Sequence, residues 1–142
     1  MRPDRIIVGE VRDAAAIDML QALNTGHDGS LSTGHANSPT DMLSRLESLV
    51  LLGAEIPLLA VRKQIASAID IIVHLGRLRD RSRRVLEITE VRDCKEGEIL
   101  LNPLYLFVEE GEDGGRVKGT LRKRNELIHK EKLSRAGIEI MD

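Results

Sequence analysis

Aromatic residues and cysteine are scarce in this chain of 142 residues. One tyrosine and one phenylalanine, Tyr105 and Phe107, offer little surface for stacking on nucleic-acid bases. The single cysteine, Cys94, excludes an intrachain disulfide and fits a reducing compartment. No apolar run approaches the ~20 residues of a membrane-spanning helix, and no signal-peptide pattern stands at the N-terminus. These absences predict a cytoplasmic chain with an aliphatic core.

Neither positive nor negative charge predominates in the chain. The chain has 21 Lys and Arg against 23 Asp and Glu, which gives a net charge of -2. Nothing in this balance drives the protein toward nucleic acid, so we expect no nucleic-acid partner. The length is that of about one domain and allows a real core.

Short apolar runs alternate with segments of helical spacing over the first half of the chain. In 38–53, for example, Ser38 is a typical N-cap, Pro39 fits the first helical position, and Gly53 marks the end. The run Ile71 to Val73 is typical of a strand that is buried on both faces. The alternation predicts a mostly parallel sheet with helices on its faces. We expect strands at 5–12, 30–36 and 68–78, and helices at 13–26, 38–53 and 58–68.

The composition changes near residue 79. Two strand-like stretches, 79–93 and 99–110, are separated by Gly97 and predict an antiparallel pair. A polar, glycine-rich turn at 111–119 and a terminal helix at 125–138 follow. The fold class is therefore α/β, with 1–78 as a core region and 79–142 as a β-rich subregion of the same domain.

Glu10 stands at the expected carboxyl end of the first strand, where open α/β sheets bind ligands. Gly9 before it lets a ligand or a second backbone come close. Such a carboxylate can polarise a water or stand in the second shell of a metal ion, as phosphoryl transfer requires. The alternative is a structural salt bridge from Glu10 to Arg12.

Two histidines lie in the stretch "TGHDGSLSTGHANSP" at 25–39. The eight residues from His27 to His35 do not match the spacing of a zinc site, and no second cysteine or acidic cluster is nearby, so no direct metal ligand is expected. No nucleophile-elbow pattern supports a Ser-His pair either. Thr33 and other small hydroxyls join the imidazoles at a strand end near Glu10, and such groups can donate hydrogen bonds to phosphate oxygens.

These motifs, in this order, closely resemble those of the type II/type IV secretion and pilus-assembly ATPases. The matching stretches are "RPDRIIVGEVRD", "LNTGHDGSLSTGHANSPTDMLSRLE" and "IASAIDIIVHLGRLRDRSRRVLEITEV". The C-terminal stretches "LNPLYLFVEEGE" and "EKLSRAGIEI" look most like the CpaF branch, which serves Tad/Flp-type pili.

The resemblance implies a fold and a site. It makes "VGEVR" the Walker B segment of a RecA-like P-loop ATPase domain, in which Glu10 orients or activates the attacking water. It makes the histidine stretch the family's His box, so that His35, together with His27, faces the terminal phosphate and senses the nucleotide state. The alternative for His27 is a structural role as a hydrogen-bonding side chain with a fixed tautomer. Gly9 and Thr33 would lie at the nucleotide, and Arg12 would reach a phosphate or a neighbouring subunit, unless it pairs with Glu10 or Asp13.

The resemblance also implies cofactors, partners and a location. The implied cofactors are ATP and Mg²⁺. The implied partners are further copies of the chain in a homohexamer and pilus or secretion platform proteins of the inner membrane. The implied location is a peripheral position at the cytoplasmic face of that membrane. The sequence departs from the family because no G-x-x-x-x-G-K-[ST] loop is present, and Gly34 replaces a larger apolar residue. We therefore expect the C-terminal part of a motor ATPase. The alternative is an inactive fragment that at most associates with ATPase subunits.

Overall fold

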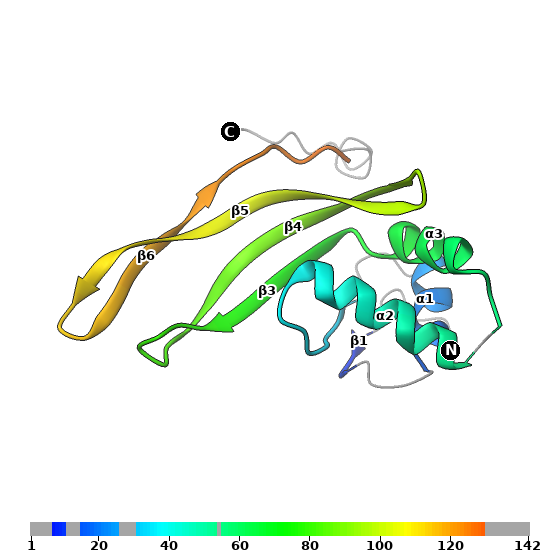
Figure 1. Cartoon of the computed structure of the whole chain (residues 1–142), viewed down its shortest axis with the longest axis horizontal. Helices are drawn as coiled ribbons and strands as arrows, with labels where there is room; N and C mark the ends of the chain where they lie inside the picture. Colours follow the sequence, from blue (N-terminus) through cyan, green and yellow to red (C-terminus); the bar gives the residue numbers. More distant parts are fainter. Residues whose placement is uncertain (1–6, 11–14, 26–30, 54, 130–142) are drawn as a thin grey trace.

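The computed structural model describes residues 7–10, 15–25, 31–53 and 55–129, and it places a cluster of helices at one end of a long sheet (Figure 1). The elements follow in the order β1 (Ile7–Val8), α1 (Ala16–Asn24), β2 (Leu31–Ser32), α2 (Pro39–Gly53), α3 (Leu58–Ala68), β3 (Ile71–Arg77), β4 (Arg83–Lys95), β5 (Glu98–Asp113) and β6 (Arg116–Lys123).

The described strands form two sheets. β1 and β2 are parallel, with Ile7 opposite Leu31, while β3, β4, β5 and β6 form an antiparallel sheet in that order. The prediction of a mostly parallel sheet holds for the pair of β1 and β2 and is otherwise wrong for the described strands. The connections explain the difference, because β1 and β2 are joined through α1, whereas β3, β4, β5 and β6 are joined to one another by short turns that favour antiparallel pairing.

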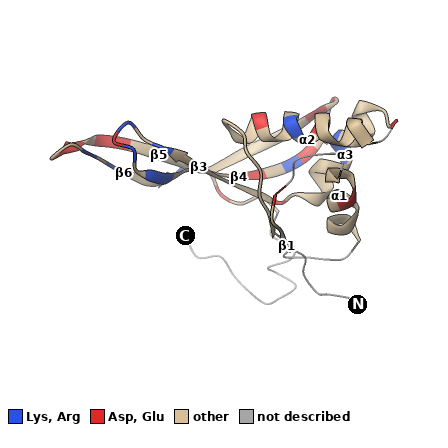
Figure 2. Cartoon of the chain, turned by 90° about the horizontal axis from the view of Figure 1, so that it is seen from below, with Lys and Arg blue, Asp and Glu red and all other residues tan. Residues whose placement is uncertain are grey.

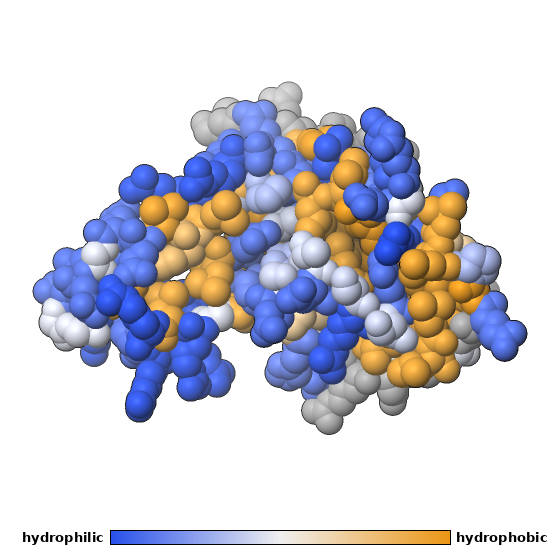
Figure 3. Space-filling view, viewed as in Figure 1, coloured by the Kyte–Doolittle hydropathy of each residue, from blue (hydrophilic) through white to orange (hydrophobic). Residues whose placement is uncertain are grey.

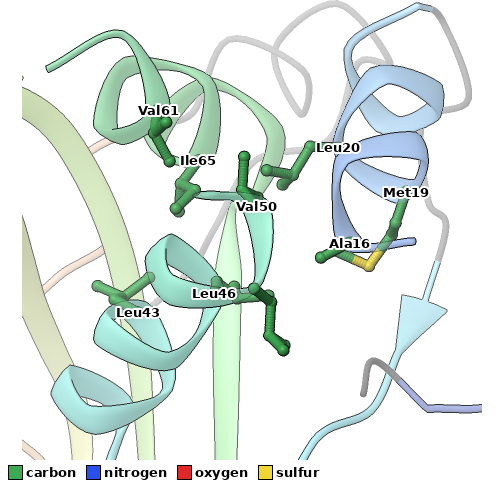
Figure 4. Packing of buried hydrophobic residues seen from close by; sticks show 9 residues of the cluster. Ala16, Met19, Leu20, Leu43, Leu46, Val50, Val61 and Ile65 are labelled. Atoms are coloured by element: carbon green, nitrogen blue, oxygen red, sulfur yellow. The ribbon is translucent and has the colours of Figure 1, made fainter. Parts of the chain in front are cut away.

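The buried core lies among the three helices. In α2 the helical spacing of Leu43, Leu46, Leu49 and Val50 presents one apolar face to the other helices. Figure 4 shows Leu43, Leu46 and Val50 of α2 in one cluster with buried residues of α1 and α3. Each fully buried aliphatic side chain contributes about 1.5–3 kcal/mol. The core members are Ala16, Met19, Leu20, Leu43, Leu46, Leu49, Val50, Val61 and Ile65.

Two predicted helices are confirmed closely. The backbone N–H of Asp41 donates to Ser38 Oγ at 3.1 Å, as expected of an N-cap, and α2 ends at Gly53. α3 covers the predicted 58–68. α1 begins within the predicted 13–26, but the expected cap Asp13 lies outside the described residues.

The antiparallel pair after residue 79 is confirmed as β4 and β5, and β6 extends it. Gly114 and Gly115 make the turn between β5 and β6 with φ values of 57° and 81°, which glycine adopts without strain. The prediction of a helix at 125–138 is wrong at its start, because 125–129 are not helical. There the N–H groups of Ile128 and His129 donate to Glu90 instead of forming a helical turn. Residues 130–138 lie outside the described part.

The run Ile71 to Val73 is not buried on both faces as predicted. Ile72 packs against the core, but Ile71 and Val73 are 42% and 53% exposed. Apolar atoms accordingly reach the surface over both the helical end and the sheet (Figure 3).

Lys, Arg, Asp and Glu residues are frequent along the part of the sheet that extends beyond the helices (Figure 2). Arg122 pairs with Glu110 at 2.9 Å, and Arg79 pairs with Glu109 and Glu112, all in exposed positions where solvent screening leaves such pairs little effect on stability. None of the described helices has both the length and the apolar character that crossing a bilayer would require.

Candidate functional site

The parallel pairing of β1 and β2 brings two chain segments together at one edge. Gly9 and Glu10 follow β1 directly, and Thr33, Gly34 and His35 follow β2. Because parallel strands end at the same edge, polar side chains that lie 25 residues apart in the sequence become neighbours there. This edge is the candidate functional site.

A carboxylate and an imidazole are in contact at the site. Glu10 Oε1 lies 3.0 Å from His35 Nε2. The Glu10 side chain is 21% exposed and that of His35 is 82% exposed, so the pair has one sheltered and one open member. The open side of the pair is accessible to water and to a ligand.

A second contact joins the same two segments. The Thr33 hydroxyl donates a hydrogen bond to the backbone carbonyl oxygen of Gly9, immediately before Glu10. This bond fixes the two segments against each other and thereby holds Glu10 opposite His35. The structure thus brings together the four described residues that the sequence predicted for the site: Gly9, Glu10, Thr33 and His35.

Gly34 has a packing role at this edge. A Cβ atom there would lie 2.6 Å from Cε of Met42 in α2. The absence of a side chain therefore lets Met42 lie against the strand that leads to His35, and the methionine occupies space that a larger residue at position 34 would need.

The other predicted site residues are not described. Arg12 and His27 lie outside the described residues, so their roles, including a salt bridge from Arg12 to Glu10, stay predictions. Across 7–10, 15–25, 31–53 and 55–129, no group of three or more His, Cys, Asp or Glu is placed to hold a metal ion.

One polar group that sequence reasoning missed is Glu90, whose side chain is 1% exposed in the centre of β4. It accepts hydrogen bonds from Asn102 and from the backbone N–H groups of Ile128 and His129. Burial favours a higher pKa for this carboxyl, but the three hydrogen bonds outweigh it and the pKa is lowered. In the sequence nothing distinguishes Glu90 from Glu87, which is also on β4.

Fold and site together define a class of protein. The chain is an α/β protein that presents a carboxylate and an imidazole at the carboxyl ends of two neighbouring parallel strands, where such folds bind ligands. The sequence profile of the Type II/IV secretion system protein family matches residues 1–114. The chain belongs to this family, which confirms the family-level resemblance.

Curated relatives come from conjugation and secretion systems. A putative conjugal transfer protein of Mycobacterium tuberculosis is 46% identical over 95 residues, covering 67% of this chain and 27% of the relative. VirB11 of Agrobacterium fabrum is 45% identical over 76 residues, covering 51% of this chain and 22% of that protein. The chain therefore spans about a quarter of the length of these relatives.

A solved structure is also similar. The VirB11 ATPase from the Brucella suis type IV secretion system, in complex with sulphate, matches with a TM-score of 0.60 and 29% sequence identity. The match covers 63% of this chain and 28% of that chain.

Proposed function

We propose that this chain is the part of a secretion-system motor ATPase that carries the water-orienting carboxylate, Glu10, and a phosphate-facing imidazole, His35. The observation that carries the proposal is the 3.0 Å contact between Glu10 Oε1 and His35 Nε2 at the ends of two parallel strands. The match to the VirB11 ATPase supports the reaction class.

The residues of this chain would act as follows. The Glu10 carboxylate accepts a hydrogen bond from the attacking water and holds it in line, and it also suits a water in the second shell of Mg²⁺. The His35 imidazole, mostly exposed beside it, donates to a phosphate oxygen when its hydrogen bond to Glu10 is exchanged for one to the ligand. The Thr33 hydroxyl keeps the two strand ends in register.

The donor set fits the reacting end of a nucleoside triphosphate. ATP with Mg²⁺ would supply the phosphoryl group and the charge neutralisation. A carboxylate, an imidazole and nearby backbone at Gly9 suit that end, but the 142 residues contain no phosphate-binding loop to hold the rest of the nucleotide. We therefore assign these residues to the part of the site that holds the attacking water. Arg12 and His27 are further proposed ligands of phosphate.

The wider setting is part of the same proposal. We propose a homohexameric motor of the CpaF type that acts in pilus assembly or protein export, peripheral to the cytoplasmic face of the inner membrane and in contact with its platform proteins. The C-terminal sequence "LNPLYLFVEEGE" supports this branch.

The test uses an ATPase in which residues 1–142 are joined to a phosphate-binding loop. Glu10→Gln is expected to reduce kcat by ~10²-fold or more while ATP binding is retained, because the change removes a transition-state role. Glu55→Gln, at an exposed position away from the site, is the matched control and is expected to keep full turnover. Near-normal kcat in Glu10→Gln would contradict the assignment of Glu10 as the water-orienting carboxylate.

A further inference from the structure

The strand β6 forms the outer edge of the antiparallel sheet (Figure 1). β5 is its one neighbour among the described strands, and Thr120, Leu121 and Arg122 of β6 are exposed. The backbone groups that this part of β6 directs away from β5 are therefore accessible to a further strand. We call the outer side of residues 116–124 the β6 edge.

The hydrogen bonds between β5 and β6 determine which residues face outward. The N–H of Arg124 donates to the carbonyl oxygen of Leu104 at 2.7 Å, and the register continues from these opposite residues without a bulge as far as Gly119. Opposite residues of an antiparallel pair alternate between exchanging two hydrogen bonds and exchanging none. Counting back from Arg124, the even-numbered residues bond to β5, so Gly119 and Leu121 direct their N–H and C=O groups to the β6 edge.

The β6 edge is basic. Residues 116–124 contain five Lys and Arg and no Asp or Glu. Like charges on facing strands oppose pairing, so this edge disfavours the same edge of a second copy and favours an acidic strand. Leu121 and Tyr105 of β5 lie on one face and are each 37% exposed, which favours an apolar residue beside them.

The last five residues of the sequence, 138–142, match these requirements. They read Ile-Glu-Ile-Met-Asp, in which acidic residues stand among apolar ones. Isoleucine favours strands, and about five residues are a typical strand length. With Ile140 opposite Leu121, the alternation of a strand also places Glu139 opposite Arg122 on the other face.

The path of the chain lets residues 138–142 reach the β6 edge. The N–H of His129, the last described residue, donates to Glu90 of β4 at 2.9 Å. From β4 to a position beyond β6 is about three strand spacings, or roughly 14 Å. The intervening residues 130–137 can span up to ~26 Å, because an extended chain covers about 3.3 Å per residue. Attachment to the same chain also keeps the segment at a high local concentration.

We propose that residues 138–142 bind the β6 edge of the same chain as an added strand, antiparallel to β6, with Ile140 opposite Leu121. The strand pairs with the outward N–H and C=O groups of β6, and its acidic side chains lie beside the basic residues of the edge. Covering this edge prevents strands of other molecules from pairing with it. The proposal requires neither a nucleotide nor the Glu10 carboxylate.

Amide hydrogen exchange, followed residue by residue, tests the added strand. The chain of 142 residues is compared with a variant that ends at Gly137. Exchange at Gly119 and Leu121 is expected to be about tenfold or more faster in the shortened variant, because their N–H groups lose their acceptors. Exchange at Thr120 and Arg122, whose N–H groups donate to β5, should change little.

Two proline variants test the register. In the proposed pairing the N–H of Ile140 donates to the carbonyl oxygen of Leu121, whereas the N–H of Met141 points away from β6. Ile140→Pro removes a donor and should speed exchange at Leu121 as much as the shortening does. Met141→Pro places the ring on the solvent side of the new edge strand, so this matched control should keep the protection.

A further pair of variants tests the role of charge. Glu139→Lys is expected to speed exchange at Leu121 by about fivefold or more, because it sets like charges side by side at the β6 edge. Glu131→Lys makes the same change of charge within 130–137 and should leave exchange at Leu121 as it is in the parent.

Four results would overturn the proposal. They are equal exchange at Leu121 in the parent and the shortened variant, protection that grows with protein concentration, equal effects of the two proline substitutions, and equal effects of the two lysine substitutions. Equal exchange would mean that the basic residues only guard the edge against pairing, and concentration dependence would assign the edge to a second copy. Turnover is a separate readout, so failure of the ATPase assignment and failure of the added strand are distinguishable.

Discussion

Replacing Glu90 with glutamine is expected to lower the free energy of unfolding by about 2 kcal/mol. The Glu90 side chain is 1% exposed. Its Oε1 accepts from Asn102 Nδ2 at 3.0 Å and from the Ile128 N–H at 2.9 Å, and its Oε2 accepts from the His129 N–H at 2.9 Å. Glutamine has one acceptor oxygen, so its amide NH₂ would face a donor, and each buried group left unpaired costs ~1–3 kcal/mol.

The loss should be concentrated where the C-terminal segment meets the sheet. Asn102 Nδ2 also donates to the Glu126 carbonyl oxygen at 2.9 Å, so Glu90 and Asn102 together hold residues 126–129 against β4 and β5. Amide exchange at Ile128 and His129 should therefore accelerate in Glu90→Gln, whereas exchange in the helical core, for instance at Val50, should change much less.

The assay is urea unfolding followed by circular dichroism. A loss of about 2 kcal/mol moves the midpoint by roughly 1 M when the slope is ~1–3 kcal/mol/M. Glu98→Gln, an exposed carboxylate on β5, is the control and should shift the midpoint little. The reasoning is refuted if Glu90→Gln and Glu98→Gln unfold at the same urea concentration with equal protection at His129.

The pH dependence gives an independent check on Glu90. Because its pKa is lowered in the folded chain, the stabilisation from its charge is fully present above the unfolded value of ~4.3 and is lost as the pH falls through the lower folded value. The parent should therefore lose stability below pH ~4 more steeply than Glu90→Gln does.

The remaining predictions concern the extended sheet. Gly119→Ala should lower the free energy of unfolding by ~1–3 kcal/mol, because its Cβ would lie 2.5 Å from the Val108 carbonyl oxygen; an unchanged urea midpoint would count against this. Asp80 has a pKa of about 2 because the Ser82 hydroxyl and the backbone N–H groups of Val117 and Ser82 donate to it. The stabilisation from the Asp80 charge is fully present above the unfolded pKa of ~4 and is lost as the pH falls toward ~2. Over that range Tm should therefore fall less steeply in Asp80→Asn than in the parent. Equal slopes of Tm against pH in the two proteins would contradict this prediction.

Local signals in the sequence were sufficient for several elements. The Ser38 cap, Pro39 and Gly53 act through near neighbours only, and α2 occupies the predicted residues. The two strand ends that the sequence placed next to each other also meet in the structure, where the pairing of β1 with β2 puts Glu10 beside His35. The roles of these two residues, and the boundary expected near residue 79, stay predictions.

Other features depend on contacts between distant parts of the chain. The predicted helix at 125–138 failed at its start because Glu90, far away in the sequence, accepts from the N–H groups of Ile128 and His129. The prediction that Ile71 to Val73 is buried on both faces reflected an apolar composition, but composition does not say which part of a chain supplies the cover. Among the described residues, none covers the side chains of Ile71 and Val73 fully.

The geometry of the Glu10–His35 pair depends on the segment that follows Leu31. Thr33 donates to the Gly9 carbonyl oxygen, Gly34 leaves space for Met42 of α2, and His35 is the next residue. The proposed phosphoryl transfer would benefit from exclusion of water, yet the His35 side chain is 82% exposed. The proposed ATPase therefore requires further protein surface over His35 when nucleotide is bound, whereas Glu10, at 21% exposure, is already sheltered by the residues described.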